Sequence, residues 1–302
     1  MIFPNKVKIV EVSPRDGLQN ESQLITVNSK IKLIELLIDA GVSFIEAGSF
    51  VNPEWVPQMA TTDQVLNGIK ANKNATFSVL VPNMYGFKQA MESGVKEVSI
   101  FASASETFSK KNINCSIKDS LRRFLPILES AIDKKIPVRA YISCIAGCPY
   151  EGKVQPSKVA ALASELYQMG CYEISLADTT GIGTPGIISQ IIENVSAKIP
   201  HSSIAGHFHD TYGQALVNIY TALSMGVSIF DSSVAGLGGC PYVKNPDKNI
   251  ASGNIATEDL IYMLNGLNIE HNIDLKKLLK ASLFISKKIK KIGTSKVSAA
   301  LT

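Results

Sequence analysis

Apolar segments of strand length alternate with amphipathic helical segments along most of the 302 residues, which predicts an α/β fold of the TIM (β/α)8 barrel type. Several helix-to-strand junctions carry a glycine, at Gly41, Gly94, Gly170 and Gly226. Glycine just past a helix is the usual left-handed cap, so each of these positions marks a helix end. Polar residues follow five of the predicted strands, and a closed barrel brings all five strand ends to one mouth.

The predicted strands are near-continuous runs of apolar and β-branched residues, as expected for parallel strands that are buried on both faces. They cover residues 7–12, 43–48, 75–81, 96–102, 137–144, 171–177, 203–209 and 228–234. An open, doubly wound sheet is the rival architecture. It would scatter the polar strand ends along one edge, whereas a ring places the first strand beside the eighth.

Helical periodicity is clear at residues 29–39 and 116–133. In the second of these segments Ser116 and Asp119 have the spacing of a capping box, which predicts that the helix begins there. The eighth helix of the barrel is expected at residues 257–267.

The sequence predicts one domain over residues 1–302, because no linker or low-complexity segment divides it. We expect the barrel at about 5–267 and a C-terminal helical extension at about 268–302. Within that extension a basic amphipathic stretch at 274–291 predicts one or two further helices.

Composition excludes several classes of protein. The net charge of +4 is mild and no basic stripe with interleaved aromatics is present, so nucleic acid is not an expected partner. No apolar run reaches membrane-spanning length, and the first residues have neither signal-peptide nor transit-peptide character, so we expect no membrane association and a cytoplasmic location. Five cysteines, an odd number, argue for reduced thiols, and the CxxxC pair Cys144 and Cys148 is interpreted as structural.

A pair of histidines marks the predicted seventh strand. His207 and His209 are two residues apart, so their side chains share one face of the strand. Ile204 and Phe208 have the opposite parity and give the strand an apolar rear face. Two of the four histidines of the chain on one face favour a metal site over a pair of satisfied core histidines.

Acidic and basic residues follow other strands. Arg15 and Asp16 lie in a turn after the first strand, where an ordinary surface ion pair is the alternative interpretation. Glu46 interrupts an apolar strand, and because an unpaired buried acid is costly, we expect Arg15 as its partner. Asp178 is a further acid at a strand end. The GxGxxG match at 181–186 lacks the context of a dinucleotide site.

Cys240 lies in the loop after the eighth strand, just behind Gly236, Gly238 and Gly239. A free cysteine is usually an inert, buried, small apolar residue. These glycines offer little apolar packing and allow movement, so the Cys240 thiol is a candidate reactive group at the barrel mouth.

Taken together, these motifs resemble the 3-hydroxy-3-methylglutaryl-coenzyme A lyases, which belong to a metal-dependent lyase and synthase group of TIM barrels. The similar segments are residues 13–21, 49–59, 108–116, 148–152, 207–215 and 234–242. The resemblance implies that a divalent cation is bound by Asp16, His207, His209 and Asn254. The expected catalytic residues are Arg15, Asp16, Glu46, His207 and Cys240.

Two features depart from the pattern of these lyases. Phe208 stands where cysteine is common, on the rear face of the strand where an apolar residue is expected. The loop between Tyr242 and Asn254 is longer than usual, and its Asn245-Pro-Asp-Lys-Asn segment is expected to bulge into solvent. The longer loop makes the position of Asn254 a point for the structure to test.

The resemblance implies cleavage of an acyl-coenzyme A substrate, a tertiary β-hydroxy thioester, to acetyl-coenzyme A and acetoacetate. A cation with open sites can chelate the substrate hydroxyl and carboxylate and lower the hydroxyl pKa. Arg15 would neutralise charge on the thioester oxygen, and either Asp16 or His207 would accept the hydroxyl proton. Mg²⁺ or Mn²⁺ is expected and Zn²⁺ stays open. A homodimer and a place in leucine degradation and ketone body formation are further expectations.

Three alternatives stay open on the sequence. The first is a Claisen-type synthase or aldolase of the same barrel group, acting on a 2-oxo acid. The second is a non-haem iron oxygenase, since two histidines and one aspartate also form a facial triad. The third is a metal-loaded barrel that binds acyl-coenzyme A without turning it over.

Overall fold

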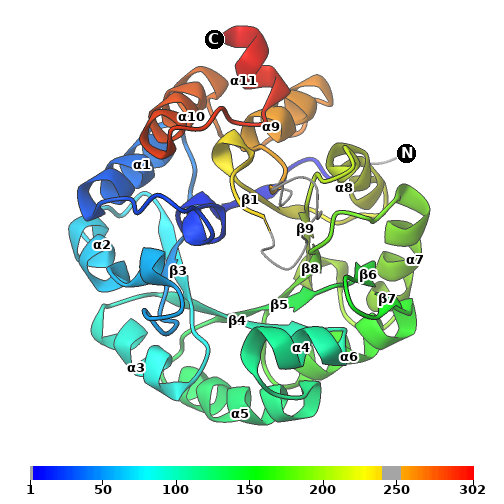
Figure 1. Cartoon of the computed structure of the whole chain (residues 1–302). Coiled ribbons are helices and arrows are strands. Elements are labelled where there is room, and N and C mark those ends of the chain that lie inside the picture. Colours follow the sequence, from blue (N-terminus) through cyan, green and yellow to red (C-terminus); the bar gives the residue numbers. More distant parts are fainter. Residues whose placement is uncertain (1–2, 240–252) are drawn as a thin grey trace.

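The structure of the protein is a computed structural model, and it describes residues 3–239 and 253–302. Its parallel strands form a closed barrel in the order β1-β10-β9-β8-β5-β4-β3-β2, surrounded by helices (Figure 1). The ring closes because β1 (Lys8–Glu11) pairs with β2 (Phe44–Ser49) on one side and with β10 (Ile229–Ser232) on the other. The predicted TIM barrel is therefore confirmed, and the open sheet is excluded.

All of the predicted strands are present, with small shifts at their ends. The other barrel strands are β3 (Thr76–Leu80), β4 (Glu97–Ser103), β5 (Val138–Ser143), β8 (Glu173–Asp178) and β9 (Ile204–Phe208). A short antiparallel hairpin, β6 (Gly147–Cys148) with β7 (Gly152–Lys153), lies outside the barrel. The sequence did not predict this hairpin, because two-residue strands leave no periodic pattern.

The helices of the barrel layer are α1 (Val27–Asp39), α2 (Thr62–Ile69), α3 (Met84–Glu92), α4 (Glu106–Ile113), α5 (Ile117–Asp133), α6 (Pro156–Gln168), α7 (Pro185–Ser196), α8 (Ala215–Ser224) and α9 (Thr257–Gly266). The capping box predicted before α5 is confirmed, since Ser116 Oγ accepts a hydrogen bond of 3.0 Å from the Asp119 backbone N–H. Among the described residues, no helix is long and apolar enough to cross a membrane.

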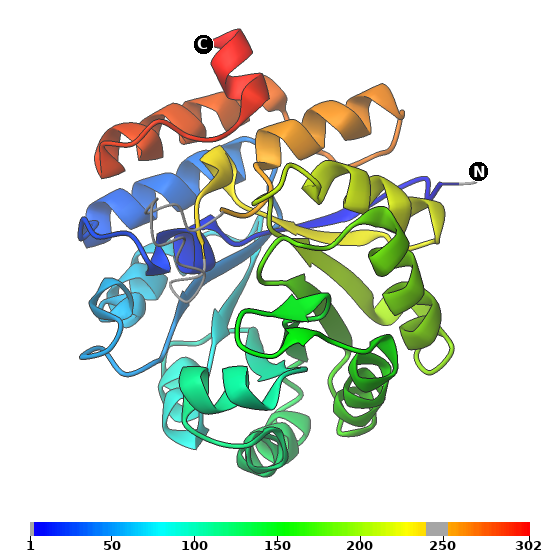
Figure 2. The same cartoon turned by 45° about the vertical axis from the view of Figure 1, so that its right-hand side comes forward.

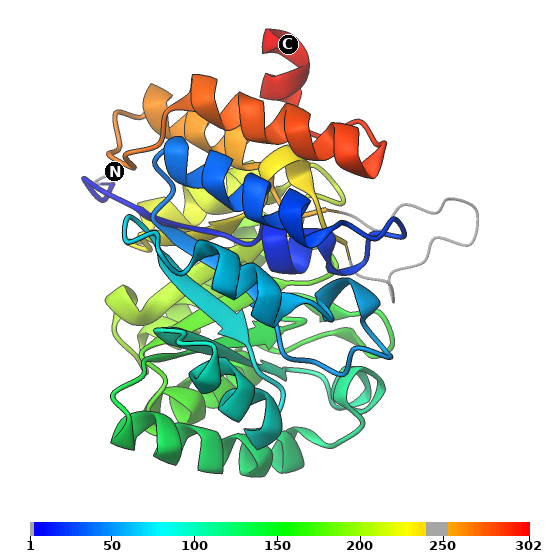
Figure 3. The same ribbon diagram turned by 90° about the vertical axis from the view of Figure 1, so that its left-hand side faces the viewer.

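The predicted C-terminal helices follow the barrel. Helix α10 (Leu275–Ile289) packs along α1, and α11 (Lys296–Leu301) contacts α9. Figures 2 and 3 show this helical layer against the N-terminal and eighth units of the barrel. The extension therefore covers the seam where the first and last strands of the ring meet.

Alternation along each strand separates an outer apolar core from a polar barrel interior. Ile204 and Phe208 belong to the large apolar cluster shared with the helices, whereas Ala205 belongs to a small cluster that also contains Val10 and Ile229. His207 has the parity of Ala205 and so points into the barrel. The predicted apolar rear face and nitrogen-bearing front face of this strand are both confirmed.

Candidate metal centre

The predicted site residues that the structure describes converge at the carboxyl end of the barrel, where a cavity of about 620 Å³ opens. Arg15 and Asp16 follow β1, Glu46 lies in β2, and the two histidines come from the end of β9. The cavity wall includes Arg15, Asp16, His207 and His209, together with apolar side chains of β3 and β4. This is the face on which barrel enzymes carry their active sites.

The segment after β1 was expected to be a turn and is instead one turn of π-helix over Ser13–Gly17. The Gly17 N–H donates to the Val12 carbonyl, five residues earlier, over 3.1 Å. A Cβ on Gly17 would lie 2.6 Å from Ser233 Oγ and 3.1 Å from Leu237 Cβ, so a larger residue would require the loop after β10 to shift. This packing directs Arg15 and Asp16 to the cavity.

Arg15 bridges two carboxylates. Its Nε donates to Glu46 Oε2 over 2.5 Å and its Nη1 donates to Asp16 Oδ1 over 2.8 Å, which confirms the expected pairing of Arg15 with Glu46. Burial lowers the pKa of the guanidinium, but the attraction of Glu46 and Asp16 outweighs burial and raises that pKa. Nη2 makes no hydrogen bond with any described residue, so its N–H groups remain for a ligand in the cavity.

Asp16, His207 and His209 form a group that can hold a metal ion, with ligand atoms within 4.8 Å of one another. The two Nε2 atoms are 3.3 Å apart. Adjacent ligands of an octahedral ion with bonds of about 2.1 Å would be roughly 3 Å apart, so the spacing fits a shared cation.

The protonation states of these groups suit a cation as well. Burial raises the pKa of Asp16, but Arg15 and the two histidines outweigh it and lower the pKa to about 2. Burial, followed by the neighbouring His207, lowers the pKa of His209 to about 4. At neutral pH the site therefore offers a carboxylate and an uncharged His209 imidazole, which are the forms that bind metals.

Asn254 lies against this group despite the longer loop that precedes it. Its backbone forms an isolated bridge with His209, and its Nδ2 donates to Asp16 Oδ2 over 2.7 Å and to the Leu237 carbonyl over 3.0 Å. Its Oδ1 is buried and has no hydrogen-bond partner among the described residues. An unpartnered amide oxygen beside a carboxylate is a suitable further ligand for a hard cation.

Sequence analysis missed a second group of charged and polar residues, which lies on the Nδ1 side of the His207 ring. Asp231 Oδ2 lies 3.0 Å from His207 Nδ1, and Asp231 accepts hydrogen bonds from Arg139 Nη1 and Nη2 over 3.1 and 2.6 Å. Ser175 Oγ adds a bond of 2.9 Å, and Arg139 Nε donates to Glu173 over 2.5 Å. A pattern in the sequence could have revealed these residues. Arg139, Glu173 and Asp231 are each a charged residue at an inward-facing position of an otherwise apolar strand.

Tyr141 was also missed. Its ring contacts both arginines, with the Arg15 and Arg139 guanidinium carbons 5.3 and 4.8 Å from the ring centroid. It meets the His207 ring edge to face at 5.8 Å. Burial raises the pKa of the Tyr141 hydroxyl well above its usual value, so this side chain stays neutral. Tyr141 therefore packs between the two arginine clusters without adding charge.

One other predicted polar residue, Asp178, does not join the centre. Asp178 accepts a hydrogen bond of 2.7 Å from the Gly183 backbone N–H, which ties it to its own loop, and burial raises its pKa to about 6. Cys240 and most of the lengthened loop lie outside the described residues. The preceding Gly239 lines the cavity, and its carbonyl accepts a hydrogen bond of 2.6 Å from Asn20.

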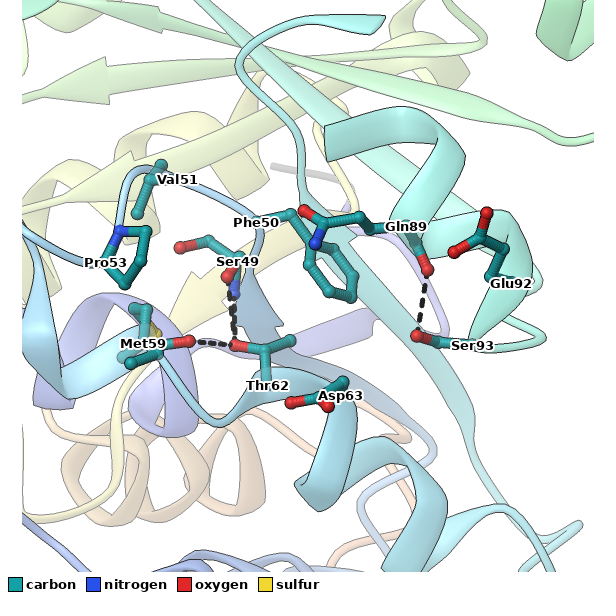
Figure 4. A pocket seen from close by; sticks show the side chains of 11 residues that line it. Ser49, Phe50, Val51, Pro53, Met59, Thr62, Asp63, Gln89, Glu92 and Ser93 are labelled. Carbon is teal, nitrogen blue, oxygen red and sulfur yellow. Dashed lines mark hydrogen bonds between the residues drawn. The ribbon is translucent and has the colours of Figure 1, made fainter. Parts of the chain in front are cut away.

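A smaller cavity of about 390 Å³ lies beside the main one and shares Val51 with it. Figure 4 shows its wall, in which Thr62 Oγ1 donates to the carbonyls of Ser49 and Met59 over 2.9 and 2.8 Å. None of the predicted site residues lines this cavity. The chemistry expected from the sequence is therefore confined to the larger one.

Comparison with protein families gives a match to the HMGL-like family over residues 6–285. A 3-hydroxy-3-isohexenylglutaryl-CoA/hydroxy-methylglutaryl-CoA lyase of Pseudomonas aeruginosa is 54% identical over 301 residues, 100% of this chain and 99% of the relative.

Solved structures give the same assignment. The hydroxymethylglutaryl-CoA lyase of Pseudomonas aeruginosa superposes with a TM-score of 0.96 at 54% identity, covering 100% of this chain and 99% of the other. An HMG-CoA lyase of Acinetobacter baumannii, in complex with coenzyme A and 3-methylmalate, has a TM-score of 0.93 at 34% identity and covers 100% and 97% of the two chains.

Proposed function

This chain belongs to the HMGL-like family, and on that premise we propose that its cavity cleaves 3-hydroxy-3-methylglutaryl-CoA to acetyl-CoA and acetoacetate. The full-length similarity to proteins named as lyases of this substrate supports the activity and disfavours the synthase, oxygenase and non-catalytic alternatives. The observation in this chain that carries the proposal is the unpaired Nη2 of Arg15 beside the Asp16, His207 and His209 group.

Asp16, His207 and His209 are proposed to hold a divalent cation, with Asn254 Oδ1 as a fourth ligand. When bound, such a cation lowers the pKa of the substrate hydroxyl and neutralises its carboxylate. The mixed nitrogen and oxygen donors favour Mg²⁺ or Mn²⁺, with Zn²⁺ as the alternative. The separation of the two Nε2 atoms and the unpartnered amide oxygen support this ligand set.

Arg15 is proposed to bind the thioester oxygen. Breaking the bond between C2 and C3 moves an electron pair onto the acetyl-CoA fragment, so negative charge develops on that oxygen. Glu46 and Asp16 occupy Nε and Nη1 of the guanidinium and fix its plane, which leaves Nη2 as the donor for the developing charge. A donor held in place before the reaction stabilises the transition state without a reorganisation cost.

The reaction also needs one proton removed and one added. The substrate hydroxyl loses its proton to Asp16 or His207 and becomes the ketone of acetoacetate. Cys240 is proposed to protonate the acetyl-CoA enolate, as its resemblance to the lyase pattern implies, and the residue before it, Gly239, lines the cavity. Cys240→Ser is expected to lower kcat by about 10² to 10⁴, the usual effect of losing a proton-transfer group, while cation affinity stays unchanged.

The direct test is to incubate the purified chain with 3-hydroxy-3-methylglutaryl-CoA and Mg²⁺ or Mn²⁺ and to measure acetoacetate. Activity should disappear with a chelator and return on adding back the cation. Acetyl-CoA with a 2-oxo acid serves as the synthase arm of the assay. Turnover in that arm alone, or binding of the thioester without any acetoacetate, would contradict the proposed activity.

The range of acyl groups is a finer question. The Pseudomonas aeruginosa relative is named for an isohexenyl substrate as well, and the cavity here has an apolar wall of Leu80, Phe101 and Phe108. The isohexenyl thioester therefore belongs in the same assay. A kcat/KM within tenfold of the methyl substrate would indicate that this wall accepts longer substituents.

Acyl-coenzyme A is proposed as the small-molecule partner, supported by the coenzyme A complex of the Acinetobacter baumannii relative. The cytoplasmic location, the single domain, the homodimer, and the place in leucine degradation and ketone body formation remain predictions. Light scattering on the purified chain would test the homodimer.

A further inference from the structure

Asp231, on the Nδ1 side of His207, accepts hydrogen bonds from two buried side chains. Both of its oxygens accept hydrogen bonds from Arg139, and Ser175 Oγ donates to Oδ2 over 2.9 Å. The Asp231 side chain is fully buried and Arg139 is 1% exposed, so no water competes for these bonds. The Asp231 carboxylate therefore has one orientation, with Oδ2 directed at His207.

An ionised carboxylate can only accept hydrogen bonds. Because Asp231 Oδ2 lies 3.0 Å from His207 Nδ1, that ring nitrogen must carry the hydrogen and donate it. The other ring nitrogen, Nε2, then presents a lone pair toward His209 and Asp16. We propose that Asp231 is a positioning residue that sets the tautomer and ring orientation of His207 before any cation binds. This rests on the cation role of His207 proposed above.

His209 provides the contrast within the same site. The backbone of Thr179 interacts with its ring, and its Nδ1 is not held by a carboxylate as His207 Nδ1 is held by Asp231. Its Nε2 lies 3.3 Å from His207 Nε2. A buried carboxylate therefore orients the ring of His207, and no carboxylate does the same for His209.

Nitrogen NMR of the cation-free wild-type protein tests this directly, with ¹⁵N-labelled histidine at neutral pH. The chain has four histidines, and His201→Gln, His209→Gln and His271→Gln assign the signals. The expected result is the Nδ1–H tautomer for His207. On adding Mg²⁺, His207 should keep this tautomer. A His207 ring in the Nε2–H form, or a mixture of both forms, overturns the proposal.

A variant of the aspartate gives the second measurement. Asp231→Ala should leave His207 in a mixture of tautomers and weaken Mn²⁺ binding by about 10-fold to 100-fold, as loss of a group behind a metal ligand usually does. Asp231→Asn can keep an oxygen at the Oδ2 position. This variant should therefore retain the Nδ1–H tautomer of His207 and lose less Mn²⁺ affinity than Asp231→Ala. Wild-type affinity and an unchanged His207 tautomer in Asp231→Ala would overturn the proposal.

The matched control is another buried aspartate, away from the site. Asp259 accepts hydrogen bonds from Ser295 Oγ and from the backbone N–H groups of Lys296 and Val297 over 2.7, 3.2 and 2.9 Å. Asp259→Asn should lower stability without changing Mn²⁺ affinity or the tautomer of His207. If Asp231→Ala does not fold, the wild-type spectrum and Asp231→Asn decide the question. A protein with the expected His207 tautomer that binds no cation would refute the proposed metal role and not the tautomer assignment.

Discussion

Arg15 and Arg139 are both buried arginines that bridge two carboxylates, yet their surroundings differ. Arg139 donates from Nε, Nη1 and Nη2, to Glu173 and to both oxygens of Asp231. Arg15 donates from Nε to Glu46 and from Nη1 to Asp16, and keeps Nη2 unpaired among the described residues. An arginine whose three nitrogens all bind buried carboxylates holds its neighbours in place, whereas an arginine with a free nitrogen at a cavity can also bind a ligand.

The two clusters also differ in depth. Arg15 lines the cavity, while Arg139 is 1% exposed and lies nearer the amino end of the strands. Tyr141 contacts both guanidinium groups and separates one cluster from the other. His209 belongs to the Arg15 cluster at the cavity, and His207 connects the two clusters through Asp231. Substitutions in the Arg139 cluster should therefore affect folding stability, and substitutions in the Arg15 cluster should affect catalysis.

Arg139→Met should have the largest effect, on folding. The change leaves Glu173 and Asp231 without the cation that both of them contact, in a part of the barrel where neither is hydrated. Removing one partner of a buried ion pair costs about 3–5 kcal/mol, and urea denaturation would measure the loss in the free energy of unfolding. A loss below about 1 kcal/mol would mean that the cluster is not structural.

The stability of the cation-free protein should fall as pH decreases from about 6.5 to about 4, because His209 stays neutral when folded. Burial lowers its folded pKa to about 4, whereas the unfolded chain binds a proton near the usual value of 6.5. Stability is thus present above the unfolded pKa and is lost below it, by on the order of 3 kcal/mol.

Thermal unfolding across this pH range would measure the effect. His209→Asn removes the titrating imidazole and should flatten the pH dependence between about 6.5 and 4. An equally steep decline in that variant would assign the acid sensitivity to another group. Saturating Mg²⁺ should shift the wild-type decline to lower pH, because a cation competes with protons for the imidazole.

Arg15→Lys should lower kcat by about 10² or more with little change in KM. Lysine keeps the positive charge but lacks the planar guanidinium that holds an N–H donor at the thioester oxygen. Circular dichroism should show a folded protein, since a cation remains beside Glu46. Steady-state kinetics with the proposed substrate would measure the change. If KM rose and kcat held, Arg15 would be a ground-state binding residue.

Lys8→Met should have the smallest effect. Lys8 Nζ donates to Glu173 over 2.9 Å at the solvent end of the Arg139 cluster, and its side chain is 19% exposed. Losing such a partly solvated bond costs about 1 kcal/mol. Mn²⁺ affinity and kcat should match the wild type. A drop in Mn²⁺ affinity would show that the cluster transmits changes from the amino end to His207.

The sequence by itself determined the features that depend on local pattern. Junction glycines and apolar runs located the eight barrel strands, and the spacing of His207 and His209 predicted their common face. Because a buried acid needs a partner, the pairing of Glu46 with Arg15 also followed from the sequence. These predictions hold because strand parity and helix capping are set by neighbouring residues.

Only the tertiary structure decided what meets across the barrel. The contact between Arg139 and Asp231 joins residues 92 positions apart, and Asn254 reaches Asp16 across 238 positions. Such partners depend on strand order and on the register of the closed ring, and neither leaves a periodic trace in the chain. The π-helical turn of residues 13–17 depends likewise on a distant loop that packs against Gly17. The sequence therefore identified Arg15, Asp16, His207 and His209 at the cavity, while the closed barrel determined which partners hold them there.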